Sequence, residues 1–155
     1  MIDKPLSMHF RLSEFLHSET AVRLGLDNDP PDTVLANIEV ITAPGMQRIR
    51  DILGCPINIS SGYRSPEVNA RVGGAANSAH TKGLAVDFTA PTFGLPRTIC
   101  RRMMETSNRV LFDQLIFEGT WVHVGFPAAG QKARGEVLTA VFKPGQPTTY
   151  VMGVG

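Results

Sequence analysis

Apolar residues recur at helical spacing along residues 31–53, which predicts the longest helix of the chain. The stripe consists of Val34, Leu35, Ile38, Ile41, Met46, Ile49 and Leu53. Pro44 falls within the stripe and has no backbone N–H to donate, so we expect a kink there. Two shorter helices are predicted over residues 65–74 and 95–106, the first of them opening on a serine followed by a proline.

Short segments with strand-like patterns follow the long helix. They are residues 57–61, 84–89, 114–117, 121–126, 137–142 and 149–152. A tight turn at Glu118, Gly119 and Thr120 joins the third and fourth of these segments. The order of elements predicts an α+β fold, with helices first and a mostly antiparallel sheet later. No repeat or linker divides the chain, so we expect residues 1–155 to form one domain.

Composition narrows the classes of function. A chain of 155 residues with 43% hydrophobic side chains can form a stable core without disulfide bonds. We therefore expect Cys55 and Cys100 to be buried, reduced thiols. The net charge is +1 and the longest basic run is Arg101 and Arg102, so neither a nucleic acid nor a membrane is expected as a partner. The first residues show no signal peptide, which predicts synthesis in the cytoplasm, and we expect a monomer.

Three residues suggest a metal site. His80 precedes Gly83, at which the backbone can turn, and Asp87 follows on a predicted strand. His123 lies on another predicted strand and shares a face with Trp121. A hydrolytic zinc site needs three nitrogen or oxygen ligands and one open position, which His80, Asp87 and His123 would supply.

Spacing alone leaves a plainer interpretation open for the same residues. His80 would then cap a turn, Asp87 would be a surface carboxylate, and His123 would be a half-buried histidine with a satisfied hydrogen bond. A histidine and an aspartate with six residues between them, followed by a remote second histidine, arise often by chance.

The surrounding motifs are more specific. They are S-G-Y-R-S at residues 61–65, S-x-H-x-x-G-x-A-x-D at residues 78–87, and W-x-H at residues 121–123. In this order they resemble the zinc D-Ala-D-Ala carboxypeptidases and L-alanyl-D-glutamate endopeptidases, over roughly residues 8–127. The resemblance implies that His80, Asp87 and His123 bind one zinc ion. It also implies the fold shared with lysostaphin-type and Hedgehog-type zinc domains, an antiparallel sheet of about four strands flanked by helices.

Peptide hydrolysis at zinc requires a general base and a group that stabilises the oxyanion. Glu118, at the tip of the predicted hairpin, is the expected base, with Asp113 at the far end of the strand as the competitor. Similar peptidases often place an acid three positions before the last histidine, where this chain has Thr120. Arg64 offers a rigid guanidinium for the oxyanion or for a substrate carboxylate, as the resemblance also implies.

Three further residues are expected to bind substrate, each with an alternative structural role. Ser78 either donates a hydrogen bond to substrate or caps a turn, whereas Tyr63 and Trp121 either wall the cleft or belong to the core.

The leading hypothesis is therefore a peptidase that hydrolyses L-alanyl-D-glutamate, or a bond next to D-alanine, in peptidoglycan stem peptides. Short relatives without a signal peptide are often phage endolysins that reach the wall through a holin. The alternatives are a catalytically silent, zinc-stabilised cell-wall-binding or virion module, and a zinc hydrolase with another substrate on the same fold.

Overall fold

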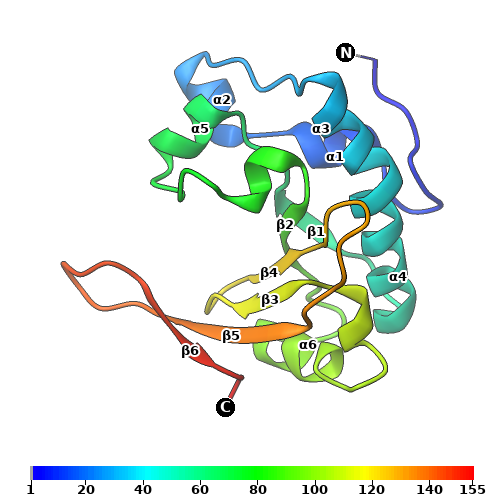
Figure 1. Ribbon diagram of the computed structural model, residues 1–155, viewed down its shortest axis with the longest axis vertical. Helices are drawn as coiled ribbons and strands as arrows, with labels where there is room; N and C mark the ends of the chain where they lie inside the picture. Colours follow the sequence, from blue (N-terminus) through cyan, green and yellow to red (C-terminus); the bar gives the residue numbers. More distant parts are fainter. Residues whose placement is uncertain (1) are drawn as a thin grey trace.

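A six-stranded sheet in the order β1-β2-β4-β3-β5-β6 forms the centre of the computed structural model, which describes residues 2–155. The strands are β1 (Asn58–Ser61), β2 (Ala85–Thr89), β3 (Gln114–Phe117), β4 (Val122–Gly125), β5 (Glu136–Val141) and β6 (Thr149–Met152). All neighbours are antiparallel except β3 and β5, which are parallel. Figure 1 shows β5 and β6 projecting as a hairpin beyond the rest of the sheet. The predicted α+β class is confirmed.

The strand number differs from the family-based expectation. Each of the six strand-like segments forms a strand, whereas the resemblance implied a sheet of about four. The two additional strands lie at one edge, because residues 126–135 carry the chain back to β3 as an extended loop. This return makes β5 run parallel to β3 and extends the sheet by two strands.

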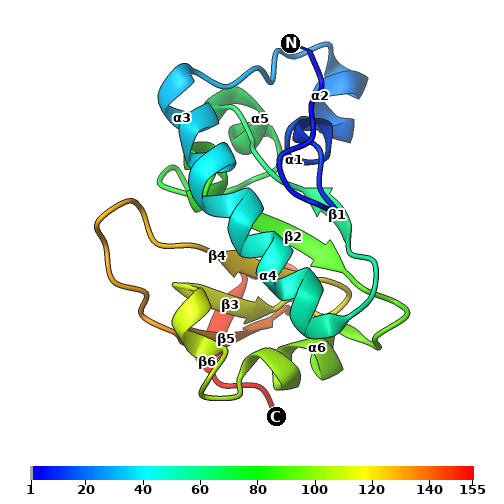
Figure 2. The same ribbon diagram turned by 90° about the vertical axis from the view of Figure 1, so that its right-hand side faces the viewer.

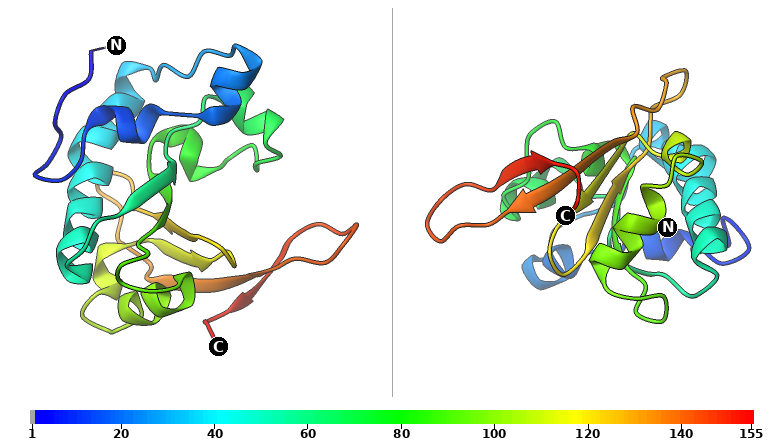
Figure 3. Two further views of the ribbon diagram at one scale, coloured as in Figure 1. Left: turned by 180° about the vertical axis from the view of Figure 1, so that it is seen from behind. Right: turned by 90° about the horizontal axis from the view of Figure 1, so that it is seen from below.

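Helices cover one face of the sheet and one end of the molecule. They are α1 (Leu12–Leu16), α2 (Glu19–Leu24), α3 (Asp32–Asn37), α4 (Ala43–Leu53), α5 (Pro66–Arg71) and α6 (Pro96–Met103). Two 3₁₀ turns, η2 (Ala79–Lys82) and η3 (Arg109–Leu111), complete the set. Figure 2 shows α4 crossing in front of the sheet, and the left view of Figure 3 shows α1, α2 and α5 gathered at one end. Among the helices of residues 2–155, none has the length and apolar character needed to cross a bilayer.

The long predicted helix is divided by a π-helical turn, η1 (Ile38–Thr42), which joins α3 to α4. Pro44 cannot donate the bond that a regular helix would make to the carbonyl four residues earlier. Directly before it the helix widens, and the Ala43 N–H donates to the carbonyl of Ile38, five residues back. The kink expected at Pro44 is therefore a π turn immediately before it.

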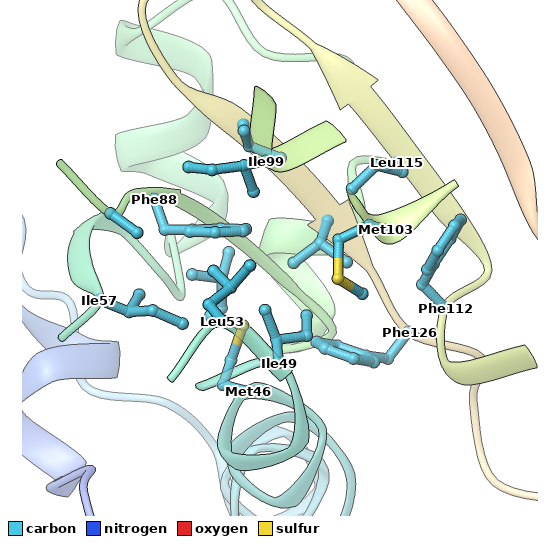
Figure 4. Close-up of a cluster of buried hydrophobic side chains, with 14 of the residues drawn as sticks. Met46, Ile49, Leu53, Ile57, Phe88, Ile99, Met103, Phe112, Leu115 and Phe126 are labelled. Atoms are coloured by element: carbon cyan, nitrogen blue, oxygen red, sulfur yellow. The ribbon is translucent and has the colours of Figure 1, made fainter. Parts of the chain in front are cut away.

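The core fills the space between the helices and one face of the sheet. From β2, β4 and β3 it receives Val86, Phe88, Val122, Val124 and Leu115, and from α4 and α6 it receives Met46, Ile49, Leu53, Ile99 and Met103. Figure 4 shows several of these side chains interlocking. Cys55 and Cys100 are buried and free, as predicted. Because side chains alternate along a strand, the residues between the core positions point to the opposite face of the sheet.

Candidate metal centre

His80, Asp87 and His123 converge on that opposite face. Asp87 on β2 and His123 on β4 are direct partners in the antiparallel register, so their side chains leave the sheet side by side. His123 Nδ1 lies 3.0 Å from Asp87 Oδ1, and His80 Nε2 lies 3.3 Å from the same oxygen. The two histidine nitrogens are also 3.3 Å apart. The three atoms therefore form a nearly equilateral triangle.

This triangle has the dimensions of a zinc site. Zinc bonds of about 2.0–2.1 Å in a tetrahedron place neighbouring ligand atoms roughly 3.3 Å apart. The donor set of two imidazole nitrogens and one carboxylate oxygen matches zinc's preference, and three protein ligands leave a fourth position open. The residues present thus fit the metal that the motifs imply.

His80 is oriented by its own loop. It lies in η2, where the Ser78 hydroxyl accepts a hydrogen bond from the His80 N–H at 3.2 Å. Gly83 ends this turn with φ of +69°, a conformation that favours glycine. The His80 ring places Nδ1 2.7 Å from the carbonyl oxygen of Gly62, which leaves Nε2 to face Asp87 and His123. Such a second contact fixes the ring and selects the nitrogen that can bind metal.

Gly62 is needed at this point because the chain passes very close to α1. A Cβ atom added to Gly62 would lie 2.4 Å from the carbonyl oxygen of Phe15. The next residue, Tyr63, donates its N–H to that same oxygen at 2.7 Å. The glycine of the S-G-Y-R-S motif therefore lets this loop dock on α1 with its own carbonyl directed at His80.

Burial sets the charge state of His80, and contacts with the two histidines set that of Asp87. His80 is 2% exposed, and burial lowers its pKa, which favours the neutral imidazole that binds metal. Burial alone would raise the pKa of Asp87, but the contacts with His123 and His80 together hold that pKa below its usual range. Asp87 is therefore an anion between two imidazoles.

A cleft of about 660 Å³ opens over the triangle and is lined by Arg64 and Glu118. No hydrogen bond to another residue of the described range 2–155 involves the Arg64 side chain, and its Nε is buried without a partner. Burial lowers the pKa of Arg64, yet a guanidinium titrates so high that it stays charged. The cleft thus holds a half-buried cation that is free to bind an anionic group.

The two carboxylates considered as bases have different surroundings. Burial raises the pKa of Glu118, and the charges of His123, Asp87 and Arg64 act on the same carboxylate. Asp113 is engaged by Arg134, whose Nη2 lies 2.8 Å from Asp113 Oδ2, and this hydrogen-bonded pair lowers the pKa of Asp113. A half-buried carboxylate with a raised pKa is the better proton acceptor near neutral pH, which favours Glu118.

The remaining predicted site residues divide into two groups. Ser78 and Trp121 line the cleft, Ser78 while capping η2 as described. Tyr63 is 3% exposed, belongs to the core and does not line the cleft. The alternative given for it, a structural role in the core, therefore holds in place of the expected contact with substrate. In the same motif, the Gly62 carbonyl faces His80 and Arg64 lines the cleft. The spacing of the three residues does not reveal that Tyr63 is the one that packs into the core.

Sequence reasoning did not single out Leu138 on β5 or Tyr150 on β6, although both line the cleft. Both come from the C-terminal hairpin, which bears no recognisable motif. Their only sequence signal is alternation along the strand, and that signal becomes useful once the strand order is known.

Comparison with known proteins agrees with this geometry. No match was found among curated proteins. The model of the family described as peptidase M15 matches residues 8–125, which include all three motifs and the whole triangle. Members of this family use zinc. The chain therefore belongs to the peptidase M15 family and is a hydrolase of the metallopeptidase class.

Proposed function

We propose that this chain is a zinc peptidase that hydrolyses an amide bond in peptidoglycan stem peptides, of the L-alanyl-D-glutamate endopeptidase or D-Ala-D-Ala carboxypeptidase type. His80, Asp87 and His123 would hold one zinc ion, and residues 1–155 would act as one catalytic domain. The observation that carries the proposal is the triangle of ligand atoms 3.0–3.3 Å apart on the floor of a cleft that also holds Arg64 and Glu118.

Zinc in this position would lower the pKa of a bound water and polarise the scissile carbonyl. The protein's own contribution begins with holding the ligands in place. His80 is fixed through Gly62, and the register of β2 and β4 fixes Asp87 against His123. Preorganised ligands avoid a rearrangement when substrate arrives.

Glu118 is the proposed general base. Its carboxylate would take a proton from the attacking water and then deliver that proton to the nitrogen of the leaving amine. A base is most useful when its pKa approaches the working pH, and burial shifts the pKa of Glu118 upward, in that direction. The engagement of Asp113 by Arg134 supports this choice of base.

Arg64 is the proposed electrostatic group. Its guanidinium, which has no partner within residues 2–155, would donate hydrogen bonds to the developing oxyanion or to a substrate carboxylate. Trp121 and Ser78 would contact the peptide beside the metal. Stem peptides carry several carboxylates, and a cleft with an unpaired cation suits such a substrate.

The first experiment is digestion of purified Gram-negative peptidoglycan with and without a chelator, followed by mass spectrometry of the released fragments. The expected result is cleavage that the chelator abolishes and added zinc restores, with fragment masses that identify the bond. An intact wall in the presence of stoichiometric zinc would overturn the proposal in favour of a silent wall-binding module or another substrate.

The proposal includes the endolysin role suggested by the sequence. It predicts that the protein, produced inside a Gram-negative host together with a holin, lyses the culture, whereas His123→Ala does not. Equal lysis by both proteins would contradict this role without affecting the chemistry.

A further inference from the structure

The site face of the sheet continues past the metal centre onto the C-terminal hairpin. Asp87, His123, Ile116 and Leu138 are successive partners in the register across β2, β4, β3 and β5. Partners in register project to the same face, so Leu138 shares the face of the metal ligands. The cleft is lined by residues of this row as far as β5.

Tyr150 lies on the same face, one strand further. Ala140 follows Leu138 by two residues, so the two share a face, and Tyr150 is the direct partner of Ala140. Glu118 directly follows β3, two residues after Ile116, and the last β3–β5 pair, Phe117 with Thr139, puts Glu118 next to the strand position of Ala140. Glu118 and Tyr150 therefore approach the same part of the cleft from β3 and β6, with the small residue Ala140 of β5 as the partner of Tyr150.

Tyr150 is close enough to Glu118 for both side chains to contact the same ligand. Strands lie about 4.8 Å apart, so the backbones of Glu118 and Tyr150 are separated by roughly 10 Å. A tyrosine side chain spans much of that distance over a small alanine. Tyr150 and Glu118 line the same cleft, and the charge of Glu118 acts on the Tyr150 phenol. Tyr150 as a whole is 51% exposed, so its side chain is accessible to a ligand.

The hairpin that carries Tyr150 is fastened to the body of the protein. The Thr139 hydroxyl donates to the carbonyl of Gly153 at 2.6 Å, and the Gly153 N–H donates to the carbonyl of Val137 at 2.8 Å. Arg97 and Arg101 on α6 both donate to the carbonyl of Gly155. These bonds attach the end of β6 to β5 and to α6, and the β5–β6 ladder places Tyr150 opposite Ala140.

We propose that Tyr150 is a substrate-binding residue that holds the part of the peptide lying on the β6 side of the scissile bond. Arg64 follows β1, at the other end of the strand order, so the metal triangle lies between the two residues. The Tyr150 ring offers an apolar face to the peptide, and its hydroxyl donates a hydrogen bond to a peptide carbonyl or carboxylate.

This proposal rests on the proposed function and makes it more specific. Tyr150 lies outside residues 8–125, which match the family model, so membership of the family does not imply its role. A contact on each side of the metal would bind the peptide at two points, which orients the scissile bond.

The test compares Tyr150→Ala and Tyr150→Phe with Val151→Ala. Val151 is the matched control, because it lies on the same exposed strand at 52% exposure but projects to the other face. For cleavage of a purified stem peptide, Tyr150→Ala is expected to raise KM roughly five- to fifty-fold, with kcat within about threefold of wild type. Tyr150→Phe is expected to raise KM by the part of this effect that is due to the hydroxyl group. Val151→Ala is expected to leave KM and kcat unchanged.

A second measurement separates binding from turnover. Trp121 is the only tryptophan and lines the cleft, so its fluorescence reports peptide binding in a zinc-loaded Glu118→Gln background. Adding Tyr150→Ala to this background is expected to raise the Kd for the peptide by the same factor by which it raises KM.

The outcomes are distinguishable. An unchanged KM and Kd in Tyr150→Ala, with an active wild-type enzyme, would overturn this inference alone. A wild-type protein that cleaves no wall peptide would overturn the proposed function and this inference with it. If Tyr150→Ala does not fold, Tyr150→Phe and Tyr150→Leu decide, because a wild-type KM in both would exclude the contact.

Discussion

The Nδ1 atom of His80 lies 2.7 Å from the carbonyl oxygen of Gly62, and this contact determines which nitrogen faces the metal triangle. It links the S-G-Y-R-S motif to the S-x-H motif through a backbone atom. The identity of residue 62 therefore affects the metal site although its side chain is a single hydrogen.

Replacement of a ligand histidine should remove metal and activity together. We expect His80→Ala and His123→Ala to lose stoichiometric zinc, measured by elemental analysis of the purified protein, because each leaves two ligands. His17→Ala is the control, since His17 is exposed and belongs to the N-terminal helical region. Retention of one zinc per chain in either ligand variant would show that the ligand set is wrong.

Gly62→Ala should weaken zinc binding without touching a ligand. The added methyl group would collide with the Phe15 carbonyl and displace the Gly62 carbonyl from His80. Loss of such an orienting contact typically reduces metal affinity by about 10- to 100-fold. Competition with a zinc indicator measures this effect, and an unchanged affinity would mean that His80 is oriented by other contacts.

Glu118→Gln should keep zinc and lose turnover. Removal of a general base typically reduces kcat by about 10²- to 10⁴-fold, while the ligand triangle is untouched. Asp113→Asn is the matched carboxylate-to-amide control and is expected to keep kcat, because Asp113 is engaged by Arg134. A dead Asp113→Asn beside an active Glu118→Gln would reverse the assignment.

The Asp113–Arg134 pair should give a specific pH dependence of stability. The pair lowers the pKa of Asp113 in the folded state, whereas an unfolded aspartate has a pKa of about 3.9. The stabilisation is therefore complete above the unfolded pKa and is lost as the pH falls through the folded pKa. Because Arg134 is 57% exposed, the pair is worth no more than about 1 kcal/mol.

Urea unfolding of wild type and Asp113→Asn between pH 2 and pH 7 measures this contribution. The two free energies of unfolding should differ near neutrality, begin to approach each other as the pH falls below about 3.9, and converge only below the lowered pKa of Asp113 in the folded state. A difference that persists unchanged at the lowest pH would show that the carboxylate charge is not its source.

Local patterns predicted the elements well but not their order. All six strand segments were visible as alternation, which depends only on neighbouring residues. The parallel pairing of β3 with β5 depends on where the loop of residues 126–135 returns, and no local pattern encodes that path. The same limit explains why Tyr150 escaped notice, since its place beside Glu118 exists only in that strand order.

The residues of the site that lie in recognisable sequence motifs could be predicted, and the others could not. The triangle of His80, Asp87 and His123 agrees with the ligand set that the motifs imply, although its binding of zinc stays a prediction. The orientation of Tyr63 could not be read from the motif, because a loop has no fixed period that assigns inward and outward positions. The engagement of Asp113 by Arg134 joins residues 21 positions apart and was equally invisible.

The placement of metal ligands and core side chains on opposite faces of one sheet has an evolutionary consequence. Along β2, Val86 and Phe88 belong to the core whereas Asp87 between them faces the cleft, so neighbouring positions are subject to different physical constraints. Drift in the interior can proceed through compensating changes in volume without disturbing the catalyst. Leu138 and Tyr150 of the hairpin likewise face the cleft and not the core between sheet and helices, so substitutions there alter the cleft surface and leave that core in place.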